Sequence, residues 1–204
     1  MDDLTCRLLH PGDVEQAAQV ISLAFIEDPL CSYILPIRRS RLKTLIKFFR
    51  PYGEVNIKNQ RGYGVGEPLK AVAYWLTPGK ADISISIKSL GAFLPLIFTY
   101  YPLGYIRARQ VPKNTDELHQ KYASDPHYYL DNIGVLPAEQ GRGLSTRLIR
   151  PFLERADAEK VLVYTDTVTS RNVPYYEHFG FECMESRSIE NTGITIYALR
   201  RPIR

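Results

Sequence analysis

Two glycines separated by one arginine, in the stretch PAEQGRGLSTRL (137–148), are the residues best suited to bind a ligand. Gly141 and Gly143 lack a Cβ, so the backbone there can approach a bulky anion closely. The apolar pattern that follows predicts a helix, and the first amides of a helix have no partners within it. These amides lie at the positive end of the helix dipole, which favours an anion by roughly 0.3–1 kcal/mol. Arg142 and Arg147 add positive charge, so the stretch predicts a phosphate or diphosphate site.

Three phosphate-binding patterns can be compared with this stretch. The nucleoside-triphosphate loop requires a lysine directly after its last glycine, where this chain has Leu144. The dinucleotide pattern G-x-G-x-x-G has Thr146 at its last position. The third pattern, [QR]-x-x-G-x-[GA], is matched by Gln140 and Gly143, with Ser145 at the small-residue position. The glycines alone would equally suit a tight turn between a strand and a helix.

A second segment, NVPYYEHFGF (172–181), follows and decides between these readings. The two segments together resemble the GNAT superfamily of acetyl-CoA-dependent N-acetyltransferases, and look most like the branch that contains puromycin N-acetyltransferase. In that branch too a proline lies inside the helix after the pyrophosphate loop, as Pro151 does here. Ser145 departs from the usual Gly or Ala, but it is small and donates a hydrogen bond. The resemblance implies one GNAT domain over 1–204, a mixed α/β fold with a central twisted mixed sheet flanked by helices.

The resemblance also implies which residues bind the coenzyme. The backbone of Ile133 to Val135 would pair with the pantetheine arm, and one of its amides would face the thioester carbonyl as an oxyanion donor. The loop amides would hold the pyrophosphate, and Asn172 would hydrogen-bond the arm. The implied coenzyme site consists of Ile133, Gly134, Val135, Gln140, Gly141, Arg142, Gly143, Leu144, Ser145 and Asn172.

Two further residues are candidates for the chemical step. Tyr176 lies one turn after Asn172 and would protonate the leaving thiolate, because a phenol with a pKa near 10 keeps its proton at neutral pH; it could instead be a core aromatic. An alkylammonium must lose a proton before it attacks, and Asp131 could accept that proton directly or through water. Asp131 lies two residues before Ile133, so on a regular strand the two side chains share a face. Glu67, near the end of an earlier strand, is a second candidate base.

The expected reaction is the direct transfer of acetyl from acetyl-CoA to a primary amine of a small molecule. Cys6, Cys31 and Cys183 have no motif that would support a covalent acetyl-enzyme. The alternative is a non-catalytic module that binds an acyl-CoA as a sensor. The identity of the acceptor and the oligomeric state stay open, with a homodimer among the alternatives.

Composition excludes other classes of function. The net charge of +4 is small, and no run of five basic residues occurs, so nucleic acid is not an expected partner. No cysteine or histidine pair has metal spacing, so no metal is expected, and the scattered cysteines are typical of reduced thiols in the cytoplasm. The N-terminus does not resemble a secretory signal. Residues 91–106 are apolar but short for a membrane span and contain two prolines, so membrane contact is not expected.

Periodicity predicts the elements that position these residues. One helix should begin at Asp13 and end at Pro29, and a second should end before Pro51. Hairpins are predicted for 61–66 with 69–76 and for 181–189 with 193–201. A helical insertion on the acceptor side is expected at about 82–123, where Tyr100, Tyr101 and Tyr105 could line a pocket or belong to the core.

Overall fold

The computed structural model describes residues 4–78, 110–124 and 126–204, which form helices and strands in a mixed order. The strands are β1 (Cys6–Leu8), β2 (Gly62–Val65), β3 (Ala71–Leu76), β4 (His127–Val135), β5 (Leu162–Thr167), β6 (Glu182–Ile189) and β7 (Ile194–Arg201). The α-helices are α1 (Val14–Ala24), α2 (Pro29–Ile34), α3 (Arg38–Lys58), α6 (Gln110–Tyr122), α7 (Leu144–Glu159) and α8 (Asn172–Glu177). Two short 3₁₀ turns, Pro11–Asp13 and Pro137–Glu139, precede α1 and the glycine loop.

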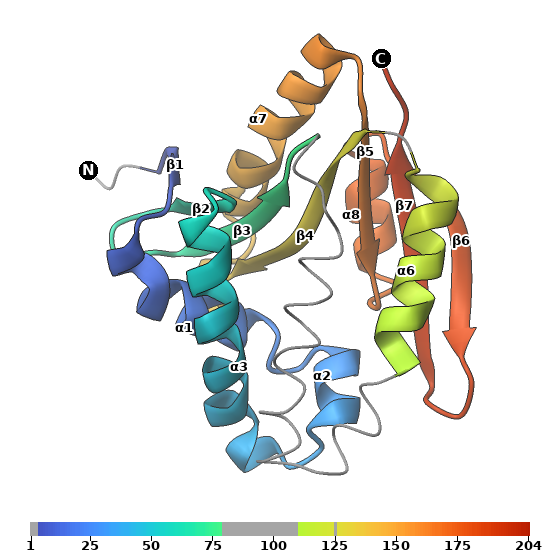
Figure 1. The fold of residues 1–204 in the computed structure, drawn as a ribbon. Helices are drawn as coiled ribbons and strands as arrows, with labels where there is room; N and C mark the ends of the chain where they lie inside the picture. Colours follow the sequence, from blue (N-terminus) through green and yellow to red (C-terminus); the bar gives the residue numbers. More distant parts are fainter. Residues whose placement is uncertain (1–3, 79–109, 125) are drawn as a thin grey trace.

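The strands form one seven-stranded sheet in the order β1-β2-β3-β4-β5-β7-β6 (Figure 1). Its neighbouring strands are antiparallel except for β4 and β5, which run parallel. Parallel neighbours need a crossover connection, and α7 supplies it on the chain between them. The structure therefore confirms the predicted mixed α/β fold with a central mixed sheet flanked by helices.

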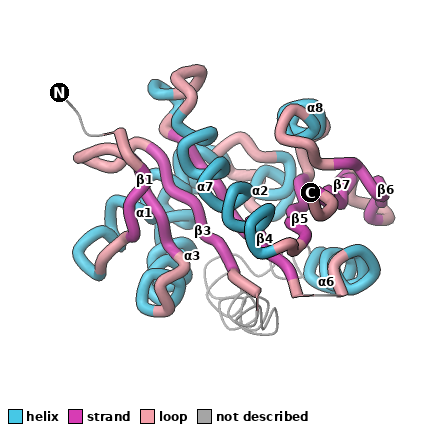
Figure 2. The backbone as a smooth tube through the Cα atoms, turned by 90° about the horizontal axis from the view of Figure 1, so that it is seen from above, coloured by secondary structure: helices cyan, strands magenta, loops and turns pink. Residues whose placement is uncertain are grey.

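Helices cover both faces of this sheet (Figure 2). On one face, α7 and α8 pack over a core around Trp75, whose ring stacks on Phe152 at 4.5 Å between centroids. On the other face, α1 and α3 pack on β3, and α6 packs on β5, β6 and β7. Apolar residues alternate along β3 between these two cores, as a doubly covered strand requires.

Both predicted hairpins are confirmed, but two prolines have roles that the sequence reading assigned wrongly. The register pairs β2 with β3 and β6 with β7 as expected. Pro29 begins α2 rather than ending α1, because Asp28 caps α2 by accepting bonds from the amides of Leu30 and Cys31. Pro51 lies inside α3, which continues to Lys58. Packing of α3 against the sheet outweighs the hydrogen bond that a proline removes.

Part of the expected acceptor-side insertion lies outside the described residues. Of 82–123, the structure describes α6 and the residues just after it. The stretch 91–106 and the tyrosines at 100, 101 and 105 fall outside. Within the described ranges, no helix has both the length and the apolar character needed to cross a membrane.

A buried ion pair ties the last strand to the helix that follows the glycine loop. Arg201 on β7 is 4% exposed and donates to both carboxylate oxygens of Asp157 on α7, at 2.6 and 2.7 Å. Its third bond goes to the Phe179 carbonyl after α8. The pair therefore holds α7 against the strands that carry the other half of the site.

Replacing Asp157 with Ala should lower the free energy of unfolding by about 1.5–3 kcal/mol, because it leaves the Arg201 guanidinium buried without its carboxylate. Urea denaturation measures this change. Arg50→Gln is the matched control: it breaks an ion pair with Glu15 in which both side chains are more than half exposed, and its effect should stay within about 0.5 kcal/mol. Equal effects of the two variants would contradict the role given to Asp157.

Candidate active site

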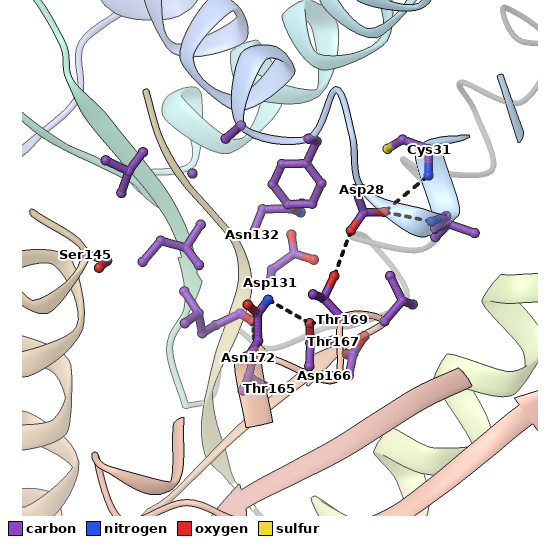
Figure 3. A pocket seen from close by; sticks show the side chains of 18 of the residues that line it. Asp28, Cys31, Asp131, Asn132, Ser145, Thr165, Asp166, Thr167, Thr169 and Asn172 are labelled. Atoms are coloured by element: carbon purple, nitrogen blue, oxygen red, sulfur yellow. Dashed lines mark hydrogen bonds between the residues drawn. The ribbon is translucent and has the colours of Figure 1, made fainter. Parts of the chain in front are cut away.

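A cavity of about 730 Å³ lies where β4 and β5 separate. Its described wall comes from α1, α2, α3 and α6 on one side, and from the start of α7, the end of β5 and α8 on the other. Figure 3 shows that the side chains of Asp28, Asp131 and Asp166 surround one space beside α2. The cavity has both apolar and charged walls, which is typical of a small-molecule site.

The separation of β4 from β5 leaves backbone groups available to a ligand. The parallel pairing runs from His127 opposite Leu162 to Leu130 opposite Thr165 and stops there, and the two strands then diverge (Figure 1). The pairing of β4 with β3 continues to Val135. Successive backbone groups of a strand face opposite sides, and the Leu136 amide bonds to β3 through the Lys70 carbonyl. The amides of Val135 and Ile133 therefore face the gap that β5 has left.

A β-bulge in β4 corrects the expected orientation of Asp131. Tyr74 on β3 pairs with Asn132 and the next residue, Trp75, pairs with Leu130, so Asp131 is the extra residue. Leu130 and Ile133 pack on the α7 side of the sheet, whereas Asp131 and Asn132 both bond to the Tyr52 hydroxyl of α3. The prediction that Asp131 and Ile133 share a face is wrong, because the bulge changes the alternation between them.

The glycine loop has the geometry that the sequence predicted for close backbone approach. Gly141 and Gly143 have φ of +76° and +72°, a left-handed conformation that other residues adopt at a cost. A Cβ added at either position would meet no atom within 4 Å, so neither glycine is required by packing against described residues. Ser145 bonds to the Tyr175 hydroxyl of α8 at 2.7 Å, which links the two helices at the cavity wall.

Most of the predicted site residues lie together on the wall of this cavity. These are Asp131, Ile133, Gly134, Val135, Gln140, Gly141, Gly143, Leu144, Ser145, Asn172 and Tyr176. Arg142 is exposed, pairs with Glu139, and lines a second hollow on the outer side of the loop with Arg147 and Arg150. Glu67 lies in the exposed turn between β2 and β3, where it pairs with Arg7 at 3.1 Å. Glu67 is absent from the described cavity wall, so the structure gives no support to its proposed role as a base.

Tyr176 is a buried core residue that also lines the cavity, and its role as an acid stays a prediction. It is 4% exposed and packs edge-on against Phe181 at 5.6 Å between ring centroids. Burial raises the pKa of its phenol, while a hydrogen bond with Thr165 acts in the opposite direction. The Thr165 hydroxyl donates to the Leu130 carbonyl at the point where β4 and β5 part. Tyr176 is thus a protonated donor close to that point.

Asp131 and Asp166 are the first residues beyond the last β4–β5 pair on their respective strands. Enclosure by protein, together with the nearby Asp166 carboxylate, raises the pKa of Asp131 to about 7, although a hydrogen bond with Asn132 acts in the opposite direction. Enclosure likewise raises the pKa of Asp166 to about 6, although Tyr129 donates to it at 2.9 Å. Two carboxyl groups of raised pKa at the vertex of the strands are suited to accept a proton near neutral pH.

Three residues of this site were not found from the sequence. Asp166 stands at the carboxyl end of β5 in the stretch YTDT, a position that could have drawn attention because parallel strands present ligands at that end. Asp28 was hidden by its other role, the N-cap of α2. Tyr52 comes from a distant helix, and only the tertiary fold brings it to Asp131.

Comparison with known proteins decides the family. The sequence profile described as the Acetyltransferase (GNAT) family matches residues 73–181, more than half of the chain. This chain belongs to the GNAT acetyltransferase family. An uncharacterised N-acetyltransferase of Schizosaccharomyces pombe is 28% identical over 192 residues, which cover 90% of this chain and 76% of that protein. The comparisons do not confirm the resemblance to the branch that contains puromycin N-acetyltransferase.

Two solved structures share the fold of this GNAT acetyltransferase at low sequence identity. One is described as histone acetyltransferase HPA2 and related acetyltransferase from Corynebacterium glutamicum, with a TM-score of 0.64, 18% identity, and coverage of 99% of this chain and 97% of that one. The other is a polyamine N-acetyltransferase of Drosophila melanogaster, which forms N-acetylagmatine, with a TM-score of 0.60, 14% identity, and coverage of 98% and 100%.

Membership of the GNAT family implies the use of acetyl-CoA, and the residues present fit this cosubstrate. Among the described residues, the start of α7 has no side-chain cap, so its amides suit a diphosphate, and the edge of β4 beyond Leu130 has no strand partner and suits an extended arm. Gln140 donates to the Val135 carbonyl at 3.4 Å and so connects the loop with that edge. Within 4–78, 110–124 and 126–204, no group of three or more His, Cys, Asp or Glu side chains gathers to hold a metal.

Asp131 should make the free energy of unfolding fall as pH rises. Its carboxyl has a pKa of about 7 in the folded state and about 3.9 when unfolded, so between these values the folded chain keeps a proton that the unfolded chain releases. Asp131→Asn cannot ionise, so this variant should be more stable than the wild type at pH 8, and the difference should shrink toward pH 4.5.

Urea denaturation at the two pH values tests this sign. Asp13 is the control of opposite direction, because its hydrogen bonds with Arg7 lower the pKa of its carboxyl. Asp13→Asn should be less stable than the wild type at pH 8, with a smaller difference in acid. If Asp131→Asn lost stability at pH 8, the raised pKa of Asp131 would be wrong.

Proposed function

We propose that this GNAT acetyltransferase transfers the acetyl group of acetyl-CoA to a primary amine of a small cationic molecule by direct attack in a ternary complex. The observation that carries this proposal is the cavity at the β4–β5 separation, which has the glycine loop at one end and carboxylates at the other. The reaction needs both ends of the cavity, because the glycine loop suits the anionic acetyl donor and the carboxylates suit the amine acceptor.

The proposed coenzyme contacts are those that the family resemblance implies, and the backbone geometry of the site supports them. The amides of residues 141–145 bind the pyrophosphate, and Gln140 holds the loop against the end of β4. The backbone groups of Ile133 and Val135 pair with the pantetheine arm, and the Ile133 amide donates to the thioester oxygen as negative charge develops there. Asn172, whose amide group bonds to the Thr167 hydroxyl at 3.1 Å, borders the same path.

Asp131 and Tyr176 divide the proton transfers between the two faces of the sheet. Asp131 faces α3 and accepts a proton from the incoming ammonium, whose nitrogen then attacks the thioester carbonyl. Tyr176 belongs to the core under α7 and α8, and it donates its proton to the thiolate as the carbon–sulfur bond breaks. The amine nitrogen loses a second proton as the amide forms, and this proton replaces the one that Tyr176 gave to the thiolate. The products are an N-acetylated amine and free coenzyme A, with one proton left on Asp131.

The charges of the cavity favour a cationic acceptor. The acidic residues on its described wall are Glu27, Asp28, Asp116, Asp131, Glu139 and Asp166, and Arg171 is the basic one. Glu27 pairs with Arg38 and Arg41, and Glu139 pairs with Arg142, so the four aspartates are the groups available to a cationic acceptor. Burial raises the pKa of Asp28 and of Asp116, so a nearby ammonium would stabilise their ionised forms. The polyamine N-acetyltransferase of similar fold supports the same class of acceptor.

The assignment of the glycine loop to coenzyme binding can be tested with two matched glycines. Gly143→Ala should weaken coenzyme A binding at least tenfold by calorimetry, because a methyl group there strains the left-handed backbone and enters the space left for the ligand. Gly193 is also left-handed, with φ of +69° and open space around it, but it lies in the β6–β7 turn. Gly193→Ala should lower stability similarly and leave coenzyme binding intact; equal binding by both variants would remove the loop from the site.

The reaction itself is tested by thiol release from acetyl-CoA with paired amines. We expect 1,4-diaminobutane to show a kcat/KM at least tenfold above that of butylamine, since the second ammonium meets the remaining carboxylates. Tyr176→Phe should lower kcat by about 10²-fold, with coenzyme affinity nearly unchanged. Coenzyme binding without turnover of any amine would identify a sensor instead, and equal turnover of both amines would reject a role of the carboxylates in binding a second ammonium group.

A further inference from the structure

The sequence Pro51-Tyr52-Gly53, in the middle of α3, has a geometry that the coenzyme and acceptor do not explain. Pro51 has no amide hydrogen, so α3 lacks one hydrogen bond at this turn. A Cβ on Gly53 would lie 2.7 Å from the Tyr74 hydroxyl, closer than atoms normally approach. Glycine therefore lets α3 pass close over β3, and this brings Tyr52 down to the bulge in β4.

The Tyr52 side chain is fixed at that position by packing and by two hydrogen bonds. It is 2% exposed, and its ring meets Phe49 and Tyr74 edge-on, at 6.1 and 5.5 Å between centroids. The side-chain amide of Asn132 donates to the Tyr52 hydroxyl oxygen at 3.1 Å. The phenol has a single proton, and that proton is donated to the Asp131 carboxylate.

We propose that Tyr52 is a positioning residue for Asp131, which aims the carboxylate into the cavity and stabilises its ionised form. This inference rests on the proposed function, in which Asp131 accepts the proton of the amine. A hydrogen bond to a charged acceptor is stronger than one to a neutral acceptor. Tyr52 thereby lowers the pH at which Asp131 becomes a working base, against the enclosure that raises its pKa.

The groups that surround Asp131 come from several elements, and each could affect its titration. Asn132 and Asp166 interact with it directly, and Asp166 in turn is bonded by Tyr129. The other titratable groups on the described cavity wall near these strands are Asp28 before α2, Asp116 and His119 on α6, Arg171 before α8, and Tyr176 on α8. The hydrogen bond from Tyr52 to Asp131 comes from α3.

Tyr74 provides a control that distinguishes a purely structural role of Tyr52 from the positioning of Asp131. Tyr74 is fully buried beside Tyr52, and its hydroxyl has no hydrogen-bond partner among the described residues. Tyr74→Phe and Tyr52→Phe each remove one buried hydroxyl from the same layer. Only Tyr52→Phe removes a hydrogen-bond donor to Asp131.

The test is the pH profile of kcat/KM for acetylation of a diamine. Tyr52→Phe should move the midpoint of the acidic limb upward by about one to two pH units, the amount expected for loss of a hydrogen bond to a charged group. Tyr74→Phe should leave the midpoint unchanged. In the Asp131→Asn background, Tyr52→Phe should cause no further change in rate, because the group it positions is already absent.

Gly53→Ala provides a second route that leaves Tyr52 in place. The added methyl group should push α3 away from Tyr74, weaken the Tyr52–Asp131 bond and shift the midpoint in the same direction. Combining it with Tyr74→Phe removes the oxygen that the methyl group meets and should restore the wild-type midpoint, since the next Tyr74 atom lies at 3.7 Å. This pair keeps the proposal testable if Tyr52→Phe does not fold.

The outcomes distinguish this inference from the proposed function. A wild-type protein that binds coenzyme A but acetylates no amine would reject the function. An active wild type in which neither Tyr52→Phe nor Gly53→Ala moves the midpoint would overturn the role of Tyr52 while leaving the function intact.

Discussion

The separation of β4 from β5 after Leu130 and Thr165 is the constraint on which the rest of this site depends. A regular parallel pair would consume the backbone groups of 131–135 and leave no edge for an extended ligand. The opening lies between two halves of the sheet, each covered by helices. Helices α1 and α3 pack on the half formed by β1 to β4, and α6 packs on the half formed by β5 to β7. The Thr165 hydroxyl bonds to the Leu130 carbonyl and satisfies the last acceptor where the strands part.

The bulge at Asp131 lets two neighbouring side chains of β4 face α3 at the point where β4 and β5 separate. A regular strand would place Asp131 and Asn132 on opposite faces, and only one of them could reach α3. With the bulge, both bond to one phenol, and the strand still returns in register with β3 through Val135. Carboxylates of raised pKa at this vertex oppose folding at neutral pH. Such carboxylates are typical of a site whose chemistry needs a base rather than of a packed core.

The parts of this structure that were predictable from the sequence depend on local interactions. The glycine loop is a short-range unit, because Gly141, Gly143 and the helix after them are adjacent in the sequence. Their types and spacing therefore predicted the loop. The loop and the later segment 172–181 together indicated the family. The two hairpins have turns and alternation that are also local. The end of α1 and the course of α3 could not be predicted from Pro29 and Pro51 alone, because they depend on the Asp28 cap and on the sheet beneath α3.

The base and its partners could not be read in the same way, because they depend on long-range register. Tyr52 and Asp131 are 79 residues apart in the chain, and nothing between them fixes their meeting except the packing of α3 on the sheet. The bulge is a mismatch of one residue between β3 and β4, and it is visible only when both strands are aligned. Asp131 was identified from its place on the strand, but its orientation was predicted wrongly for this reason.

Acidic and basic residues lie at different places around this site, which the net charge of the chain does not show. The chain carries a net charge of +4, yet the described wall of the cavity is mainly acidic beyond the point where the strands part. The basic residues Arg142, Arg147 and Arg150 line the hollow on the outer side of the glycine loop, which shares Gly143 with the cavity. In the proposed reaction, an anionic coenzyme would be attracted to the arginines on the loop side and a cationic amine to the carboxylates of the cavity.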